Sequence, residues 1–377
     1  MWGRAGDYGG MINPVPEGIE TPEVMIDLDT LQRNIDRMTT VVQGKGMGLR
    51  PHVKTHKIPQ IAALQLAAGA VGLTVATIGE AEIFVDHGAT DLFIAYPLWV
   101  TPHHARRLIQ LSATARVAVG TDSVEATRAM GKALSGAADR IEILVEIDSG
   151  HHRSGVSPSA AVEVARSAAE AGLRVSGVFT FPGHSYAPGM PVSAADQEQE
   201  ALAEAARLVG AAGFEVSRIS GGSTPTATLT RTSAATEVRP GVYVFGDAQQ
   251  LELGRCTLDD IALTIASTVV SRHEGDAHAP RRVILDAGSK VIGSDRPAWA
   301  TGFGRLADHP EARISALSEH HATVSWPDGT QLPALGERLR VIPNHVCLTM
   351  NLVDEVTVLS SGVVVDRWRV AARGKNN

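Results

Sequence analysis

The chain has 377 residues, of which 44% are hydrophobic and 20% charged, a composition typical of a soluble globular protein with one large and one smaller domain. The net charge of −7 and the scattered Lys and Arg residues argue against a nucleic-acid partner. No apolar stretch approaches the roughly 18 residues of a membrane span, the first residues lack the apolar core of a secretory signal, and only two cysteines occur. We therefore expect a cytoplasmic protein without a disulfide framework or a membrane partner.

Eight short apolar runs alternate with segments of helical pattern in the first two thirds of the chain. These runs are 48–54, 73–79, 91–97, 116–122, 142–148, 177–183, 218–223 and 242–247. Between most of them, apolar residues recur at helical spacing with a glycine near the end. Strands that are buried on both faces and separated by helices form parallel sheets, and eight repeats of this kind match a (β/α)8 barrel of the TIM type. The connection 224–241 is polar and is expected to be a loop.

The remainder of the chain is β-rich. Beyond about residue 256, segments such as RRVILDAG and EVTVLSSGVVVDRWRV are separated by Gly, Pro and Asp, as in an antiparallel barrel or sandwich. A strand at 23–29 is left over from the barrel repeats and is expected to join this part. The sequence therefore predicts an α/β fold with a barrel over 28–255 and a second, mainly antiparallel β domain formed by 1–27 and 256–377.

Lys54 ends the first expected strand, in RPHVKTHK. Active sites of such barrels lie at the C-terminal ends of the strands, where burial and nearby cations can lower the pKa of a lysine enough for it to act as a nucleophile. The position also fits a surface lysine in a basic loop, because His52, His56 and Lys57 are its neighbours. Lys54 is thus a candidate nucleophile that spacing alone does not establish.

The seventh expected strand runs into SGGSTPT at 220–226. Glycines let backbone N–H groups approach an anion, and the hydroxyls of Ser223, Thr224 and Thr226 add donors. The loops after strands seven and eight are the usual phosphate site of these barrels, although a GGST loop by itself is often only a turn. Tyr243, in the next run, either donates its phenol to the same phosphate or packs inside the barrel.

His345 and Cys347 stand two residues apart in IPNHVCLTMN. If this segment is a strand, both side chains face the same way. Imidazole nitrogen and cysteine sulfur suit a divalent metal ion such as zinc, and two protein ligands would leave positions open for water and substrate. The alternative is a buried cysteine beside a histidine whose hydrogen bonds are satisfied.

Together these motifs resemble the D-threonine aldolase and D-serine dehydratase group of fold-type III pyridoxal phosphate enzymes, which are related to alanine racemase. The resemblance rests on RPHVKTHK, EIDSGHHRSGV, SGGSTPT, EVRPGVYVFGD, RVILDAGSK, SEHH and PNHVCLTMNL, and extends from Thr21 to the C-terminal RVAARG. It implies a homodimer whose Lys54 holds pyridoxal 5′-phosphate as a Schiff base, and a small D-amino acid as the substrate. It also implies a divalent metal ion (zinc, manganese or magnesium) on His345 and Cys347.

The resemblance further implies roles for individual residues around the cofactor. It places Arg153 near the ring oxygen and Tyr186 beside the pyridine ring. The residues that it implies for the phosphate are Gly221, Gly222, Ser223 and Thr224, with Tyr243 as a further donor. For the aldolase route, the candidate base is His52 or a water molecule held by the metal.

The expected cofactor on Lys54 and the expected metal ion on His345 and Cys347 fit two lyase reactions on D-amino acids that carry a β-hydroxyl. We favour D-threonine aldolase, which cleaves the Cα–Cβ bond to give glycine and an aldehyde; the alternative is D-serine dehydratase, which eliminates the hydroxyl. The His-x-Cys pair resembles the dehydratases, whereas the following TMNLVDE resembles the aldolases. A non-catalytic carrier of pyridoxal phosphate would lack the β-rich part, and a racemase would need a tyrosine in that part, where none follows Tyr243.

Overall fold

The computed structural model describes residues 15–229 and 234–377, which form two compact units. Of the described residues, one unit contains those up to Leu31 together with Phe245–Trp368, and the other contains those of Gln32–Val244 and Arg369–Asn377. The division differs from the predicted domains at three places. Residues 28–31 and 245–255 group with the β-rich unit, and the last nine residues group with the barrel unit.

Eight parallel strands form the sheet of the barrel unit, in the order β2-β9-β8-β7-β6-β5-β4-β3. They are β2 (Gly48–Leu49), β3 (Leu73–Val75), β4 (Asp91–Pro97), β5 (Arg116–Thr121), β6 (Ile141–Glu146), β7 (Arg174–Phe179), β8 (Arg218–Gly221) and β9 (Glu237–Val238). A parallel bridge between His52 and Thr74 links the two edges of this sheet. The predicted barrel is thereby confirmed.

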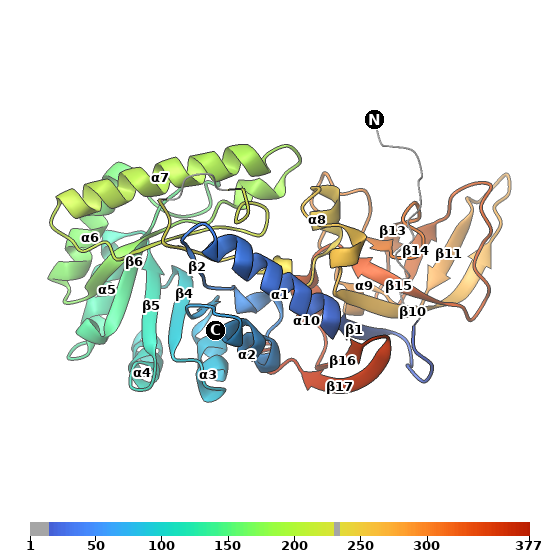
Figure 1. Ribbon diagram of the computed structural model, residues 1–377, viewed down its shortest axis with the longest axis horizontal. Coiled ribbons are helices and arrows are strands. Elements are labelled where there is room, and N and C mark those ends of the chain that lie inside the picture. Colours follow the sequence, from blue (N-terminus) through green and yellow to red (C-terminus); the bar gives the residue numbers. More distant parts are fainter. Residues whose placement is uncertain (1–14, 230–233) are drawn as a thin grey trace. The chain divides into compact units, whose positions relative to one another are not determined.

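Helices cover the outside of this sheet, as Figure 1 shows for α4, α5 and α7. They are α2 (Pro59–Ala67), α3 (Ile78–Asp86), α4 (Pro102–Leu111), α5 (Val124–Ala133), α6 (Ala161–Glu170) and α7 (Pro191–Ala211), and α1 (Leu28–Gln43) precedes β2. The N-cap side chains Thr77, Thr101 and Ser123 each accept a backbone N–H of the first turn, which fixes where α3, α4 and α5 begin. No helix in the described part of the chain is long and apolar enough to cross a membrane.

The eighth barrel strand lies earlier than the sequence predicts. It is the two-residue β9, whereas the predicted run 242–247 begins with the 3-10 turn Val242–Val244. Pro240 has no backbone N–H to donate to a ladder, so the strand ends before it. The expected loop between the last two strands is confirmed for residues 224–229, which form turns.

An ion-pair network fills the barrel at the N-terminal ends of its strands. Arg50 donates to Asp91 (2.6 Å) and Glu237 (2.8 Å), and Arg218 lies 3.7 Å from Glu142. Next to this network inside the barrel, the buried rings of Phe93 and Phe179 pack edge to face. With one end of the barrel closed by buried charges, a ligand site is expected at the other end.

The β-rich unit is one nine-stranded sheet in the order β11-β14-β13-β12-β15-β10-β1-β16-β17, and the pairing of β11 with β10 closes six of its strands into a ring. The strands are β1 (Glu23–Asp27), β10 (Leu263–His273), β11 (Arg282–Leu285), β12 (Gly304–Leu306), β13 (Arg313–Leu317), β14 (Ala322–Ser325), β15 (Arg338–Pro343), β16 (Glu355–Ser360) and β17 (Val363–Arg369). The strand expected at 23–29 joins this sheet as predicted. Three short helices complete the unit: α8 (Ala248–Glu252), α9 (Ser289–Ile292) and α10 (Val346–Met350).

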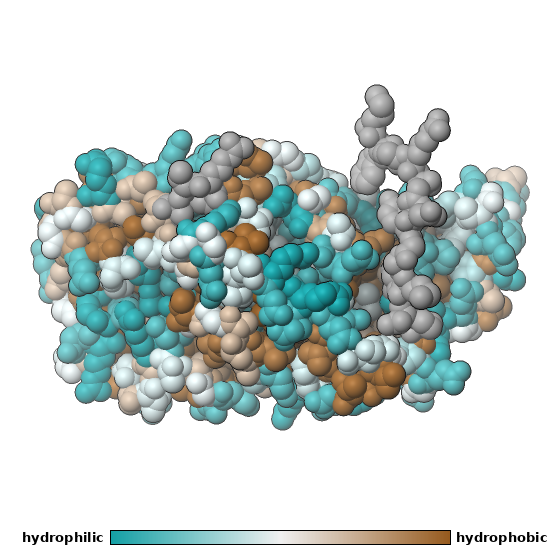
Figure 2. Space-filling model, viewed as in Figure 1, coloured by the Kyte–Doolittle hydropathy of each residue, from teal (hydrophilic) through white to brown (hydrophobic). Residues whose placement is uncertain are grey.

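An exposed apolar strip lies on the edge strand β17. Val363, Val364 and Val365 are exposed, and Figure 2 shows brown surface over this strand. Edge strands present unpaired backbone groups, so this strip is the least protected part of the sheet.

Candidate active site

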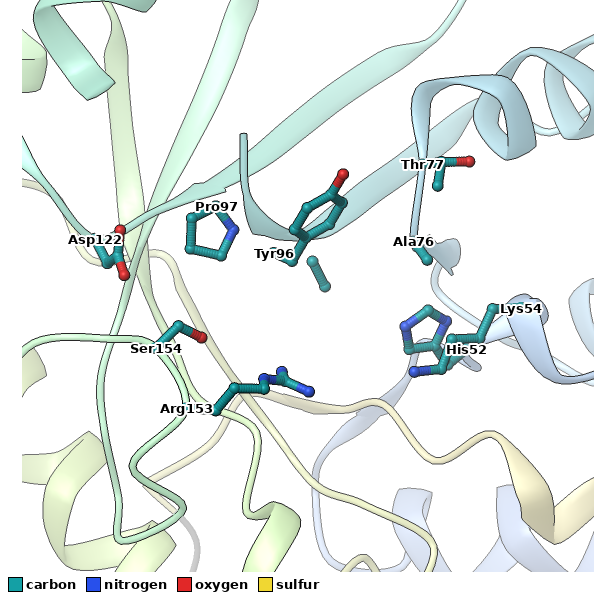
Figure 3. Close-up of a pocket in the computed structure, with 10 residues that line it drawn as sticks. His52, Lys54, Ala76, Thr77, Tyr96, Pro97, Asp122, Arg153 and Ser154 are labelled. Atoms are coloured by element: carbon teal, nitrogen blue, oxygen red, sulfur yellow. The ribbon is translucent and has the colours of Figure 1, made fainter. Parts of the chain in front are cut away.

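A cavity of about 500 Å³ opens at the C-terminal ends of the barrel strands. Cavities of this size accommodate cofactors and small ligands. The residues that line it are His52, Lys54, Ala76, Thr77, Ala95, Tyr96, Pro97, Asp122, Arg153 and Ser154. In Figure 3 the side chains of Lys54 and Arg153 enter it from opposite sides. Three of the predicted site residues (His52, Lys54 and Arg153) therefore share one cavity.

Lys54 lies in a 3-10 turn and not at the end of a strand. The ladder of β2 ends at Leu49, and Lys54 is the middle residue of the turn Val53–Thr55. Pro51 has no N–H to donate, which ends the regular ladder, and the isolated bridge of His52 with Thr74 is the last pairing before the turn. The lysine still lines the cavity, with Nζ 6.0 Å from the centroid of the Phe181 ring.

His52 provides an uncharged imidazole in the same cavity. Burial, together with the positive charges of Lys54 and Arg239, holds the pKa of His52 well below its usual range. Its buried Nδ1 has no hydrogen-bond partner among the described residues. The ring therefore offers an unprotonated nitrogen to the cavity, but the same burial and positive charges weaken it as a base, and its role as a base stays a prediction.

Phe181, which was not predicted, organises the cationic and aromatic side chains of the site. The guanidinium of Arg153 lies 5.1 Å from its ring centroid, the Tyr186 ring 6.3 Å and the His151 ring 5.7 Å. Phe181 follows β7 by two residues. A large apolar residue just beyond the C-terminal end of a barrel strand is the signal that could have identified it.

The glycine loop, residues 221–224 at the end of β8, contains a glycine in the left-handed conformation. Gly222 has a φ of +82°, and a Cβ there would meet the Cβ of Val238 at 2.7 Å, so only glycine fits. The Ser223 hydroxyl lies 2.9 Å from that of Ser185, and Thr224 accepts the backbone N–H of Tyr243 at 3.1 Å. Gly221, which ends β8, lies beside Gly222.

The loop is not part of the cavity lining described above, but hydrogen bonds connect it to the surroundings of the cavity. Ser185, its partner, is in the same short helix as Tyr186 (Gly183–Tyr186), whose ring contacts Phe181. On the other side, the backbone N–H of His52 donates to Pro240 at 3.0 Å. The loop and the Lys54 turn thus lie at the same end of the barrel.

Tyr243 is buried in the turn Val242–Val244. Its hydroxyl accepts a hydrogen bond from Gln65 Nε2 at 3.0 Å, and burial raises the pKa of the phenol above its usual value. A phenol that stays protonated keeps its own O–H available as a donor.

Glu198, also not predicted, lies directly beneath the glycine loop. It projects from α7, is 1% exposed, and its Oε1 accepts the backbone N–H of Gly222. Burial raises the pKa of this carboxyl from 4.5 to about 7. The spacing could have revealed it, because Glu198 falls at helical intervals from Ala194, Ala195 and Leu202 on the buried face.

His345 and Cys347 lie at the start of a helix, which corrects the predicted strand. β15 ends at Pro343, His345 is the N-cap of α10, and Cys347 is its second residue. The two side chains nevertheless meet, since they hydrogen-bond each other. Burial disfavours the charged imidazole, but the negative charges of Cys347 and Asp247 outweigh it and raise the pKa of His345 well above its usual range.

Asp247 completes this arrangement within the β-rich unit. Its buried Oδ2 lies 3.3 Å from His345 Nδ1. Metal-binding histidines commonly use one ring nitrogen toward a carboxylate in this way, which leaves Nε2 for the metal. Among the residues described, no group of three or more His, Cys, Asp or Glu side chains that could hold a metal ion occurs.

Comparison with known proteins extends this picture to nearly the whole chain. The family model "Alanine racemase, N-terminal domain" matches residues 26–249, and a model of a serine dehydratase domain matches residues 262–359. The chain is 35% identical to D-threo-3-hydroxyaspartate dehydratase of Delftia sp. (93% of this chain, 97% of that enzyme). It is 32% identical to D-threonine aldolase of Arthrobacter sp. (94% and 93%).

The solved structure of the Delftia enzyme superimposes with a TM-score of 0.85 at 33% identity, covering 93% of this chain and 97% of that one. At this coverage the likeness extends over both units. The chain belongs to the alanine racemase-like family of fold-type III pyridoxal phosphate enzymes, within the group of the D-threonine aldolases and D-serine dehydratases.

Proposed function

We propose that this protein is a pyridoxal phosphate-dependent lyase that acts on D-amino acids carrying a β-hydroxyl group. The observation that carries the proposal is the shared cavity of Lys54 and Arg153 at the C-terminal end of the barrel, with a glycine loop after β8 at the same end. Membership of the family supports the cofactor and the class of substrate.

The residues present fit the cofactor. The backbone of Gly222 and the hydroxyls of Ser223 and Thr224 would hold the phosphate, and the exposed guanidinium of Arg153 would face the ring oxygen. Lys54 is the amine that would hold the aldehyde carbon. When bound, the cofactor supplies an electron sink for cleavage of bonds at the substrate Cα.

The side chains around Lys54 then divide the remaining tasks. His52, kept neutral by burial and by neighbouring cations, accepts a proton at Nδ1. Arg153 lies against Phe181, whose ring restricts where the guanidinium can go. Phe181 and Tyr186 together provide an apolar wall that excludes water from the reacting atoms.

His345 and Cys347 fit a catalytic divalent ion. The Asp247 carboxylate orients His345, and two protein ligands leave positions for the substrate hydroxyl and water. A cysteine-to-alanine variant of D-threo-3-hydroxyaspartate dehydratase has been solved in the metal-free form. The substituted cysteine lies two residues from a histidine that was substituted in another variant, which is the spacing of the pair in this chain. The ion would act as a Lewis acid on the β-hydroxyl.

Two reactions use these groups. The specific observation that favours dehydration is Cys347, because the relative whose cysteine-to-alanine variant is solved in the metal-free form is a dehydratase. Elimination would turn D-serine into pyruvate and ammonia. Retro-aldol cleavage, which the sequence favours, remains the second candidate and would turn D-threonine into glycine and acetaldehyde.

The experiment is a product analysis. The purified holoenzyme is incubated with D-threo-3-hydroxyaspartate, D-serine and D-threonine, each with and without a chelator, and L-threonine serves as the control. A 2-oxo acid with equimolar ammonia supports dehydration, and glycine with an aldehyde supports the aldolase. If all three D-amino acids are inert with the cofactor and a divalent ion bound, the proposed function is wrong. The homodimer implied by the resemblance is a further prediction, which light scattering can check.

A further inference from the structure

Glu198 occupies an unusual position for a carboxyl group. Its Oε1 accepts the N–H of Gly222, a backbone donor of the proposed phosphate loop, and it also hydrogen-bonds Thr226. A Cβ on Gly221 would meet the same oxygen at 2.3 Å, so the carboxyl lies against both glycines. Its other oxygen, Oε2, is buried without a hydrogen-bond partner among the residues described.

A phosphate on this loop and an ionised Glu198 would be two negative charges that compete for the same backbone donor, the Gly222 N–H. Like charges within about 4–6 Å disfavour ionisation, and burial strengthens the effect. The carboxyl cannot move away easily, because it sits on the buried face of α7 between Ala195 and Leu202. The remaining way to relieve the repulsion is to neutralise the carboxyl with a proton from solvent.

We propose that Glu198 couples binding of the cofactor phosphate to the uptake of one proton. The carboxylate holds the Gly222 N–H while the loop is empty, and the neutral acid, a weaker acceptor, releases it when the phosphate arrives. Glu198 is thus a positioning residue for the loop. The inference rests on the proposed function, because it takes the loop as the cofactor's phosphate site.

The charges around Glu198 are compatible with this role. Arg239, at the end of β9, is the cation that acts on it, and Arg239 also interacts with the carboxylates of Glu146 and Glu237. Its guanidinium donates to Ser220 Oγ (2.9 Å) and to the carbonyl of Thr180, and it lies over the rings of Phe93 and Phe179. Arg239 is therefore shared and does not fix Glu198 as a carboxylate.

The expected pH dependence follows from the empty state. When no phosphate occupies the loop, the pKa of Glu198 is about 7, and a bound phosphate raises this pKa further. Below pH 7 the acid is already neutral and binding needs no proton. Above pH 7 the affinity should fall by up to about tenfold per pH unit, until the pH exceeds the pKa of the bound state.

The test compares wild type with Glu198→Gln, and Glu200→Gln, an exposed glutamate two residues away on α7, is the matched control. Apoprotein is titrated with pyridoxal phosphate from pH 6 to 9. Sulfate competes with pyridoxal phosphate for the loop in a second titration, and its charge does not change between pH 6 and 9. At pH 6 we expect wild type, Glu198→Gln and Glu200→Gln to bind pyridoxal phosphate with equal affinity. At pH 8 we expect Glu198→Gln to bind it about tenfold more tightly than wild type or Glu200→Gln.

Parallel pH profiles of wild type and Glu198→Gln would overturn the proposal. If Glu198→Gln does not fold, calorimetry of sulfate binding to wild type at pH 8, in two buffers of different ionisation enthalpy, decides instead. Uptake of about one proton supports the coupling, and no uptake overturns it. If wild type forms no borohydride-reducible complex with pyridoxal phosphate at any pH, the proposed function fails, which is a different result.

Discussion

Lys57 is bound to Glu80 by a buried ion pair, with 2.9 Å between Nζ and Oε1. The same Nζ lies 3.3 Å from the carbonyl of Ala372 and 3.3 Å from Oδ1 of Asn376. Lys54, three residues earlier, lines the cavity instead. Two neighbouring lysines thus have different roles, one anchoring the turn to the end of the chain and the other facing the site.

We expect Lys54→Ala to lose the Schiff base with pyridoxal phosphate, because no other lysine lines the described cavity. The variant should be colourless, and borohydride treatment followed by peptide mass mapping should find no modified lysine. Wild type should carry the label on the peptide that contains Lys54. A label on Lys57 in wild type would show that Lys57, and not Lys54, holds the cofactor.

Lys57→Met should cost about 3–5 kcal/mol of unfolding free energy, because it leaves the Glu80 carboxylate buried without its cation. Denaturant unfolding measures the loss. The double variant Lys57→Met/Glu80→Leu should recover much of it, since both buried charges are then absent. Equal stability of wild type and the single variant would contradict the buried ion pair.

Chelation or Cys347→Ala should abolish turnover while the absorbance of the bound cofactor and most of the thermal stability remain. The reason is that the pair lies in the β-rich unit, whereas Lys54 and the glycine loop belong to the barrel unit. Cys256→Ala is the control and should keep full activity and bound metal. Full activity of a chelated enzyme that elemental analysis finds metal-free would make the His345 and Cys347 pair structural.

Gly222→Ala should weaken binding of pyridoxal phosphate at least tenfold and lower stability by about 2 kcal/mol. The new methyl group meets Val238 and forces a left-handed φ on alanine. Gly213→Ala separates the two causes, because Gly213 has a φ of +93° and open space around it. It should show only the backbone cost of about 1 kcal/mol and normal cofactor affinity. Similar losses in both variants would argue against a tight loop.

His56 should make the protein labile to acid. Burial lowers the pKa of this imidazole from 6.5 to about 3, and its Nδ1 accepts the Ile58 N–H at 3.0 Å. The unfolded chain therefore binds a proton that the folded chain refuses, so stability is retained above pH 6.5 and lost as the pH falls toward 3. The loss should reach about 5 kcal/mol at the acid end.

Unfolding curves between pH 7 and 4 test this expectation. His56→Gln should reduce the slope of the profile over this range, although it is less stable than wild type at pH 7; the remaining slope comes in part from His52, whose pKa is also lowered by burial. His87→Gln, at an exposed histidine, should leave the profile unchanged. A wild-type profile as flat as that of His56→Gln would contradict the low pKa.

The periodicity of the sequence determined the architecture, because a parallel barrel needs repeated buried runs and each run is a local pattern. The runs that became β4, β5 and β6 are long enough to be recognised from their residues alone. The motifs around Lys54, Arg153, Gly222 and His345 were likewise visible, since each is contained within a few consecutive residues.

Only the tertiary structure decided what depends on partners distant in the chain. The two residues of β9 form a strand because β2 and β8 flank them, and no pattern of two residues can show that. His345 and Cys347 meet at the start of a helix, with Asp247 nearly a hundred residues away. Glu198 and Phe181 belong to the site because the barrel brings α7 and the end of β7 to the glycine loop and to Arg153. Burial and electrostatic repulsion act through space, so the consequences of these contacts cannot be read from neighbours in the sequence.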